Sequence, residues 1–184
     1  MDGQEELVYD EDNVITSGFG WSMSYLYALA GADSITDFQI DRFQIGVSGN
    51  AGAQVSSTYE LSGPLSSTSE YTGTQDSNLN AFTAKQYKNA TSPDAVFAKI
   101  PYTKVTRIDD RSVRYTIFID EDSCNDISRP GRPEAALNEI ALFVKNPTGN
   151  NINETSVMAA YRYFSDIIKT NQFGLVFRWT ITFG

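Results

Sequence analysis

The pattern of apolar and polar positions is clearest near the end of the chain. Between Leu175 and Phe183 every second residue is apolar, and the residues between them are mostly polar. A period of two places alternate side chains on opposite faces of a strand, so this segment predicts a half-buried β-strand. A strand that ends a chain must be well paired and packed, because loosely held termini fray.

Further strands are predicted in five segments, at 37–46, 95–108, 112–119, 136–145 and 157–164. Pro101 favours an edge strand or a bulge in its segment, because proline cannot donate a hydrogen bond to a neighbouring strand. Asp109-Asp-Arg111 predicts a hairpin turn between the second and third of these segments.

The segment 136–145 is apolar on both faces. We expect a central strand that is covered on two sides. Ile140, Leu142 and Val144 are assigned to one face, and the other face has these three residues: Leu137, Ala141 and Phe143. The polar residues Asn138 and Glu139 at its start need hydrogen-bonding partners if they are buried.

One short helix is predicted between Ser17 and Gly31. Ser22 or Ser24 is the expected N-cap, and Gly31 suits the C-terminal stop. The apolar residues at helical spacing are Trp21, Tyr25, Leu26 and Leu29.

Short strands separated by Gly, Pro and Asn indicate a mainly β protein. We predict an antiparallel β-sandwich with one short N-terminal helix; a jelly roll is one form of that architecture, and an open barrel is the alternative. Residues 1–13 are interpreted as an acidic arm and residues 14–184 as a single domain. Long polar loops are expected at about 47–77, where 58–61 is a short strand or turn, and at 87–94; 146–151 is a further turn.

Charge and hydropathy exclude several partners. The 184 residues include 23 acidic and 14 basic side chains, giving a net charge of −9. Nucleic-acid binding needs clustered Lys and Arg, so none is expected. A membrane helix needs about 20 apolar residues in a row, and no such run is present. The acidic start lacks the features of a secretory signal, so we expect a soluble protein made in a cytoplasm.

The composition argues against an enzyme. Histidine is absent and cysteine occurs once, which removes the common nucleophilic triads and zinc sites. Gly18-Phe-Gly20 and Gly46-Val-Ser-Gly49 do not fit a phosphate-binding loop. No catalytic, cofactor-binding or metal-binding residue and no small-molecule substrate is predicted. Cys124 lies among carboxylates, which favours an inert or partly buried thiol.

Several features keep two interpretations. Asp10–Asn13 and Asp120–Asp126 could bind calcium, but a solvated loop is favoured because the second cluster lacks the spacing of a calcium loop. Trp21 and Trp179 could line a saccharide groove beside paired acids, but core packing is favoured.

Two further features also have a functional and a plain structural interpretation. Asn89 and Asn153 match the N-glycosylation pattern, and we interpret them as chance matches in polar loops. Arg129-Pro-Gly-Arg-Pro133 is a solvated turn by default, or a contact for an acidic patch on a neighbouring subunit.

Four short phrases occur in the order found in structural proteins of tailed bacteriophages. The first is Leu137-Asn-Glu-Ile-Ala-Leu-Phe143, and the others are Val157-Met-Ala-Ala-Tyr-Arg162, Ile168-Lys-Thr170 and Phe177-Arg-Trp-Thr-Ile-Thr-Phe183. We call residues 137–183 the C-terminal block, and it resembles the β domains of such virion proteins. Upstream, the segment 40–49 resembles their strand followed by Gly-x-Gly. Ala141 stands where glycine is more usual, and the 50–94 region is longer than a minimal version.

The resemblance implies a non-enzymatic virion protein of the tail, neck or baseplate. Its expected partners are other virion proteins and copies of itself, without nucleic acid or membrane. A capsid decoration protein is the alternative within this class. A carbohydrate-binding or glycan-cleaving β module is the alternative of another class, and a host β-sandwich adaptor is a third.

Overall fold

The computed structural model describes residues 7, 10, 12–28, 38–63, 65–66, 86–87, 98–100, 102–121, 123–125, 136–145 and 156–183. These residues form the following elements: β1 (Val14–Ile15), α1 (Ser17–Tyr27), β2 (Ile40–Gly46), the 3-10 helix η2 (Ala51–Ala53), β3 (Leu65–Ser66), β4 (Gln86–Tyr87), β5 (Ala98–Lys99), the 3-10 helix η4 (Tyr102–Lys104), β6 (Val105–Arg107), β7 (Ser112–Ile119), β8 (Leu137–Lys145), β9 (Ser156–Ile167) and β10 (Leu175–Thr182).

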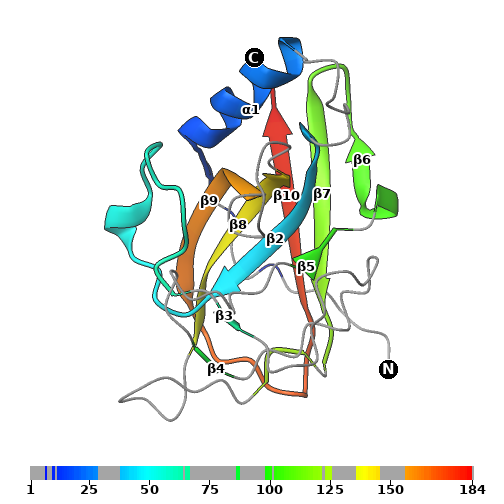
Figure 1. Ribbon diagram of the computed structural model, residues 1–184. Coiled ribbons are helices and arrows are strands. Elements are labelled where there is room, and N and C mark those ends of the chain that lie inside the picture. Colours follow the sequence, from blue (N-terminus) through cyan, green and yellow to red (C-terminus); the bar gives the residue numbers. More distant parts are fainter. Residues whose placement is uncertain are drawn as a thin grey trace.

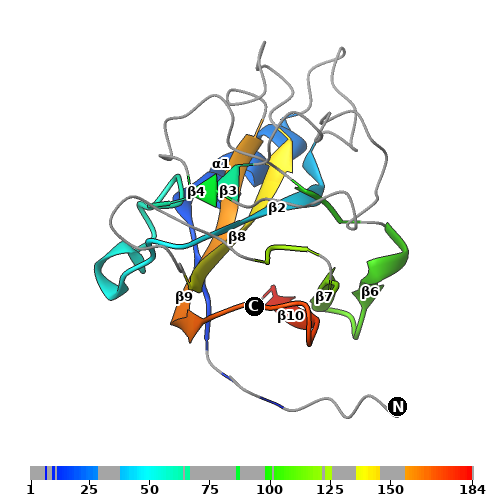
Figure 2. The same ribbon diagram turned by 90° about the horizontal axis from the view of Figure 1, so that it is seen from below.

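The strands form two main antiparallel sheets that face each other (Figures 1 and 2). The larger has the order β1-β9-β8-β2-β5, and the smaller has the order β10-β7-β6. A separate two-stranded sheet joins β3 and β4. The predicted antiparallel β-sandwich with one N-terminal helix is therefore confirmed, as two distinct sheets rather than a barrel.

The main core lies between the two sheets. Ile45 and Phe164 of the larger sheet pack with Ile117 and Trp179 of the smaller one in a single buried cluster. A second cluster covers the opposite face of the larger sheet and contains Leu61, Ala141, Phe143, Met158 and Tyr161. The larger sheet is thus packed on both faces.

Strand β8 has the predicted central position, between β9 and β2. Ile140, Leu142 and Val144 face the main core, while Ala141 and Phe143 face the second cluster. The face assigned to Leu137 was wrong, since this residue packs in the main core. The pairing of β8 with β9 is irregular between Leu137 and Glu139. Such a bulge resets the alternation of side chains, which a strict period of two cannot anticipate.

The hairpin at residues 109–111 is confirmed. Arg107 pairs with Val113 across it, and the Ile108 amide donates to the Ser112 carbonyl at 2.8 Å. The Arg111 amide donates to the Asp109 Oδ1 at 2.7 Å, which stabilises the turn.

The segment 95–108 does not form one strand. Its described part contains β5, at one edge of the larger sheet, and β6, at one edge of the smaller sheet, with η4 between them. The predicted edge position is confirmed for both strands, and Pro101 itself lies outside the described residues. The chain crosses from one sheet to the other here.

Helix α1 begins five residues before the predicted cap at Ser22. Thr16 holds the N-cap position, and its hydroxyl donates to the Met158 carbonyl rather than capping the helix. Ser22 is buried within the helix and donates to the Gly18 carbonyl, whereas Ser24 donates to that of Trp21. The start is set by the preceding strand β1, because the Thr16 amide still pairs with Ala159 of β9.

Other predicted features fall outside the described residues. Among them are most of the predicted loops after residue 63 and after residue 87, the turn at 146–151 and the basic loop at 129–133, together with Leu29, Gly31, Asn89 and Asn153. The loop predicted at about 47–77 was wrong at Leu65–Ser66, which form β3 by pairing with β4. The segment 58–61 is described and contains a bend rather than a strand.

Candidate functional site

A buried carboxylate lies where the C-terminal block meets the 46–63 loop. Glu139 of β8 is 0% exposed. Its Oε1 accepts from the Gly63 amide at 2.6 Å, and its Oε2 accepts from the Ser62 amide at 3.0 Å and the Tyr161 hydroxyl at 3.1 Å. Both oxygens are therefore used to hold a loop and a neighbouring strand, and neither reaches solvent.

The environment of Glu139 has opposing effects on its pKa. Burial raises the pKa of the Glu139 carboxyl, because the charged form loses hydration. The amides of Ser62 and Gly63 and the hydroxyl of Tyr161 lower it, and burial has the larger effect. Since Glu139 is fully buried and both of its oxygens accept hydrogen bonds, its carboxyl holds the loop and β9 against β8.

Two glycines make room for this carboxylate. A Cβ on Gly46 would lie 2.5 Å from the Glu139 Oε1 and 2.5 Å from the Gly63 carbonyl oxygen. A Cβ on Gly49 would lie 2.6 Å from the Glu139 Cβ. The glycines of Gly46-Val-Ser-Gly49 thus allow this segment to pack closely against Glu139 and Gly63, and they do not form a phosphate site.

Asn138 and Gln54 secure the same loop. The Asn138 Oδ1 accepts from the Gly49 amide at 2.8 Å, and its Nδ2 donates to the Asp166 Oδ1 at 3.0 Å. The Gln54 Oε1 accepts from the Tyr163 amide of β9 at 2.9 Å. The expectation that Asn138 and Glu139 need partners is confirmed, and the loop is tied to two strands.

Arg162 of β9 holds the N-terminal arm where it enters the sandwich. Its guanidinium donates to the Asp12 carbonyl. Immediately after this point Val14 and Ile15 pair with Tyr161 and Ala160. Among the described residues of the arm, Leu7, Asp10 and Asp12 are exposed, and Asn13 is half-buried.

Lys169 fastens a third segment, the acidic loop at 120–125. Its side chain is only 3% exposed. The ammonium donates to the Glu121 carbonyl at 3.3 Å, to the Asn125 Oδ1 at 3.0 Å and to the Thr170 carbonyl at 2.8 Å, and it lies 5.3 Å from the centre of the Phe173 ring. The loop considered for calcium thus folds around a cation supplied by the chain.

No group of three or more His, Cys, Asp or Glu side chains that could hold a metal occurs among the described residues. Glu11, Asp122 and Asp126 of the two acidic clusters lie outside them.

The thiol of Cys124 is enclosed within the loop that Lys169 holds. Cys124 is buried and has a left-handed backbone, with φ of 61°. Burial raises the pKa of the Cys124 thiol; the nearby Lys169 lowers it and Asp120 raises it. The expected inert thiol agrees with this environment, and the residue is more deeply buried than expected.

The two tryptophans have different environments. Trp179 is buried in the main core, as expected. The core interpretation of Trp21 was wrong: this ring is half-buried on α1, outside both core clusters, and lies 4.4 Å from the Tyr25 ring. Tyr27 on the same helix is 84% exposed. A groove lined by both tryptophans is excluded, because the Trp179 ring is covered by protein.

No helix in the described part of the chain has the length and apolar character to cross a membrane. Comparisons with models of known protein families, with curated proteins and with solved structures give no match.

Sequence reasoning missed Gln54, Tyr161, Arg162 and Asp166. Their contacts join residues from 22 to 150 positions apart. Only the polar character of Asn138 and Glu139 inside an apolar strand signalled the site in advance.

Proposed function

We propose that the chain is a structural subunit of a tailed-bacteriophage virion, located in the tail, neck or baseplate. Its partners are other virion proteins and further copies of itself. The phrases of the C-terminal block that resemble virion proteins motivate this proposal.

One observation supports it most strongly. The polar residues of those phrases each hold a different segment on the sandwich: Asn138 and Glu139 hold the 46–63 loop, Arg162 holds the arm and Lys169 holds the 120–125 loop. A subunit that displays loops to its neighbours needs such a rigid base, because a preorganised surface loses less entropy on binding. The short phrases thus have a physical role in positioning the segments that contact partners.

Mass spectrometry of purified particles tests this function. A structural subunit is expected at a fixed copy number relative to the major capsid protein, and it should stay with the particles through a density gradient. Its absence from intact particles, with the protein present in the lysate, would contradict the proposal.

Cryo-electron microscopy separates the positions within the particle. A tail, neck or baseplate subunit forms one ring or a stack of rings, whereas the alternative, a capsid decoration protein, occupies hundreds of lattice sites. Density for this β-sandwich in one place or the other decides between them.

A second candidate function rests on the aromatic side chains of α1. Trp21, Tyr25 and Tyr27 offer ring faces of the kind on which sugars stack. Binding to a glycan array that is lost in Trp21→Ala would support a carbohydrate-binding module. Tyr102→Ala, at an 86% exposed ring elsewhere on the surface, is the matched control.

A further inference from the structure

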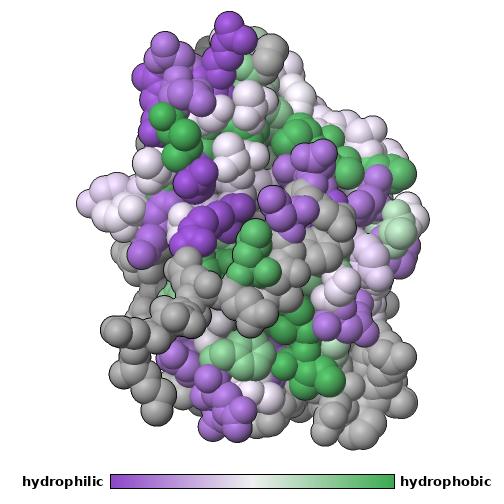
Figure 3. All heavy atoms as spheres, turned by 180° about the vertical axis from the view of Figure 1, so that it is seen from behind, coloured by the Kyte–Doolittle hydropathy of each residue, from purple (hydrophilic) through white to green (hydrophobic). Residues whose placement is uncertain are grey.

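The smaller sheet has one face in the main core and one face turned outward. Tyr115, Ile117, Trp179 and Ile181 point into the core. The alternating residues point away from it. Ser112 among them is buried, and we call the others the outer face: Thr106, Arg114, Thr116, Phe118, Val176, Arg178, Thr180 and Thr182. Figure 3 shows the molecule from this side, with hydrophilic and hydrophobic residues interspersed.

The outer face is positively charged in a chain whose net charge is −9. It carries Arg114 and Arg178 and no carboxylate among its eight residues. Arg178 lies opposite Thr116, and Arg114 lies opposite Thr180, with its Nε 3.4 Å from the Thr180 Oγ1. These two pairs are adjacent on the face, so the arginines form one cationic strip about 7 Å long.

An apolar pair continues this strip. Phe118 and Val176 are cross-strand partners, 37% and 39% exposed. Along the sheet the outer face therefore presents an apolar row, then the Arg178 row, then the Arg114 row.

The N-terminal arm has the complementary order of residues. Residues 1–13 contain six acidic side chains and no Lys or Arg. Leu7-Val-Tyr9 is flanked by Glu5-Glu6 and Asp10-Glu-Asp12. Three residues of extended chain span about 10 Å, which matches the spacing of about 7 to 14 Å from the apolar row to the arginine rows.

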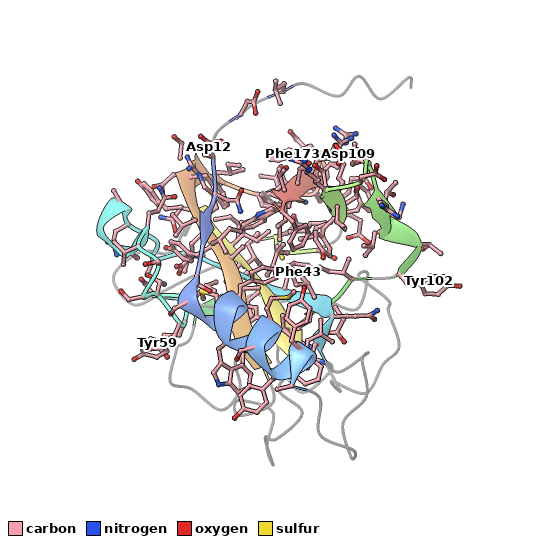
Figure 4. All side chains as sticks on the ribbon, turned by 90° about the horizontal axis from the view of Figure 1, so that it is seen from above. Asp12, Phe43, Tyr59, Tyr102, Asp109 and Phe173 are labelled. Carbon is pink, nitrogen blue, oxygen red and sulfur yellow. The ribbon has the colours of Figure 1, made fainter. Side chains whose placement is uncertain are left out.

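We propose that the outer face binds the acidic arm of a second copy of this chain. In the view of Figure 4, Asp12 of the arm lies on the same side of the sandwich as the smaller sheet. In a single copy Leu7 is 78% exposed and Asp10 and Asp12 are exposed, so their side chains are accessible to a neighbour. Burying Leu7 beside Phe118 and Val176 of a neighbour removes apolar surface from water on both partners.

This inference deepens the proposed function, since it names a contact through which copies would assemble. The two can fail separately. A protein found in particles whose arm does not bind the outer face contradicts only the inference, and an arm that binds in a protein absent from particles contradicts only the function.

The first experiment measures binding of a fluorescein-labelled peptide of residues 1–13 to the full-length chain by fluorescence anisotropy. We expect at least a tenfold weaker affinity for Arg114→Glu/Arg178→Glu, and weaker binding to the unaltered chain at higher salt. Lys104→Glu/Arg111→Glu is the matched control, since it makes the same change in net charge at exposed residues outside the outer face. Equal loss in both double variants, or no loss in the first, overturns the proposal. Arg114→Gln/Arg178→Gln replaces the first variant if charge reversal prevents folding.

The second experiment tests whether the arm binds in trans. In an arm variant the six acidic side chains become Asn or Gln, and this protein is mixed with Arg114→Glu/Arg178→Glu. Each variant alone lacks one half of the contact, so we expect monomers by sedimentation velocity. Their mixture retains one intact arm and one intact face and is expected to form heterodimers. A mixture that stays monomeric while the unaltered chain self-associates overturns the assignment to a second copy.

Discussion

Glu139 shows how a single buried charge can organise distant parts of this chain. Its carboxylate joins β8 to Ser62 and Gly63, which lie 77 and 76 residues earlier. A buried carboxylate is costly unless hydrogen bonds satisfy it, and here the Ser62 and Gly63 amides and the Tyr161 hydroxyl donate to it. Removing the acceptor leaves buried donors without partners, which costs more than the net value of the bonds themselves.

We expect Glu139→Ala to lower the free energy of unfolding by about 3–5 kcal/mol, as for loss of one partner from a buried charged network. Tyr161→Phe is the matched control at the same site. It removes one hydrogen bond and no volume, so about 1 kcal/mol is expected. Urea unfolding followed by tryptophan fluorescence measures both. Equal effects of the two variants would show that the Ser62 and Gly63 bonds contribute little.

The pH dependence of stability follows from the raised pKa of Glu139. The folded state holds this proton more tightly than the unfolded state, so the contribution to stability is fully present below the unfolded pKa and is lost as pH rises through the folded pKa. On acidification from neutral pH into that window, the unaltered chain should gain stability relative to Glu139→Gln. Urea unfolding at a series of pH values measures the difference, and a difference independent of pH contradicts the prediction.

Loss of the Lys169 ammonium should loosen the 120–125 loop. Lys169→Met keeps the side-chain length and removes the donor to Glu121, Asn125 and Thr170. We expect a loss of about 2–4 kcal/mol, since oxygens are left without a charged donor. Cys124 should also react faster with a thiol reagent under native conditions. The control Lys104→Met changes an exposed lysine and should leave both measurements unaltered.

Among the elements, α1 depends on a close contact with β9. A Cβ at Gly18 would lie 2.3 Å from the Met158 carbonyl oxygen and 2.7 Å from the Val157 Cγ1. At Gly20, in the same helix, no atom lies within 4 Å of such a Cβ. Substituting Gly18 therefore tests the packing of α1 against β9, whereas substituting Gly20 tests helix propensity alone.

Gly18→Ala should destabilise the protein by about 1–3 kcal/mol, because helix and strand must move apart. Gly20→Ala should stabilise it by roughly 0.5–1 kcal/mol through helix propensity. Thermal unfolding by circular dichroism gives the two signs directly. A stabilising Gly18→Ala would mean that α1 is not held against β9 in solution.

On the scale of the whole molecule, the arm and the sandwich are joined at β1. Deleting residues 1–11 keeps Asp12, whose carbonyl Arg162 binds, and leaves β1 intact. We expect a melting temperature within about 2 °C of the full chain and loss of incorporation into particles. Deleting residues 1–15 removes β1 as well. A loss of about 2 kcal/mol would lower the melting temperature by about 4–8 °C in a chain of this length. Equal melting temperatures for the two deletions would contradict the role given to β1.

Much of the fold follows from local pattern. The strands at 112–119 and 175–182 alternate cleanly, and the hairpin that precedes the first strand and the buried face of the second were predicted correctly. The pattern failed where another part of the chain intervened. The bulge in β8 moved Leu137 to the main core, and the pairing of Thr16 with β9 set the start of α1.

The candidate site was predicted only in part. Asn138 and Glu139 were recognised as polar residues in an apolar strand, but their partners at Gly49 and Gly63 were not. The acidic loop around Cys124 gave no sign that Lys169, more than 40 residues later, would hold it through hydrogen bonds.

The sequence by itself determined the β class, the central place of β8, and the burial of Trp179, because side-chain periodicity is a property of the local backbone. Tertiary structure alone decided which loop each polar residue holds and which face of the smaller sheet remains outward. Those outcomes depend on contacts between residues far apart in the chain, and a buried polar group shows only that it needs a partner, not where that partner lies.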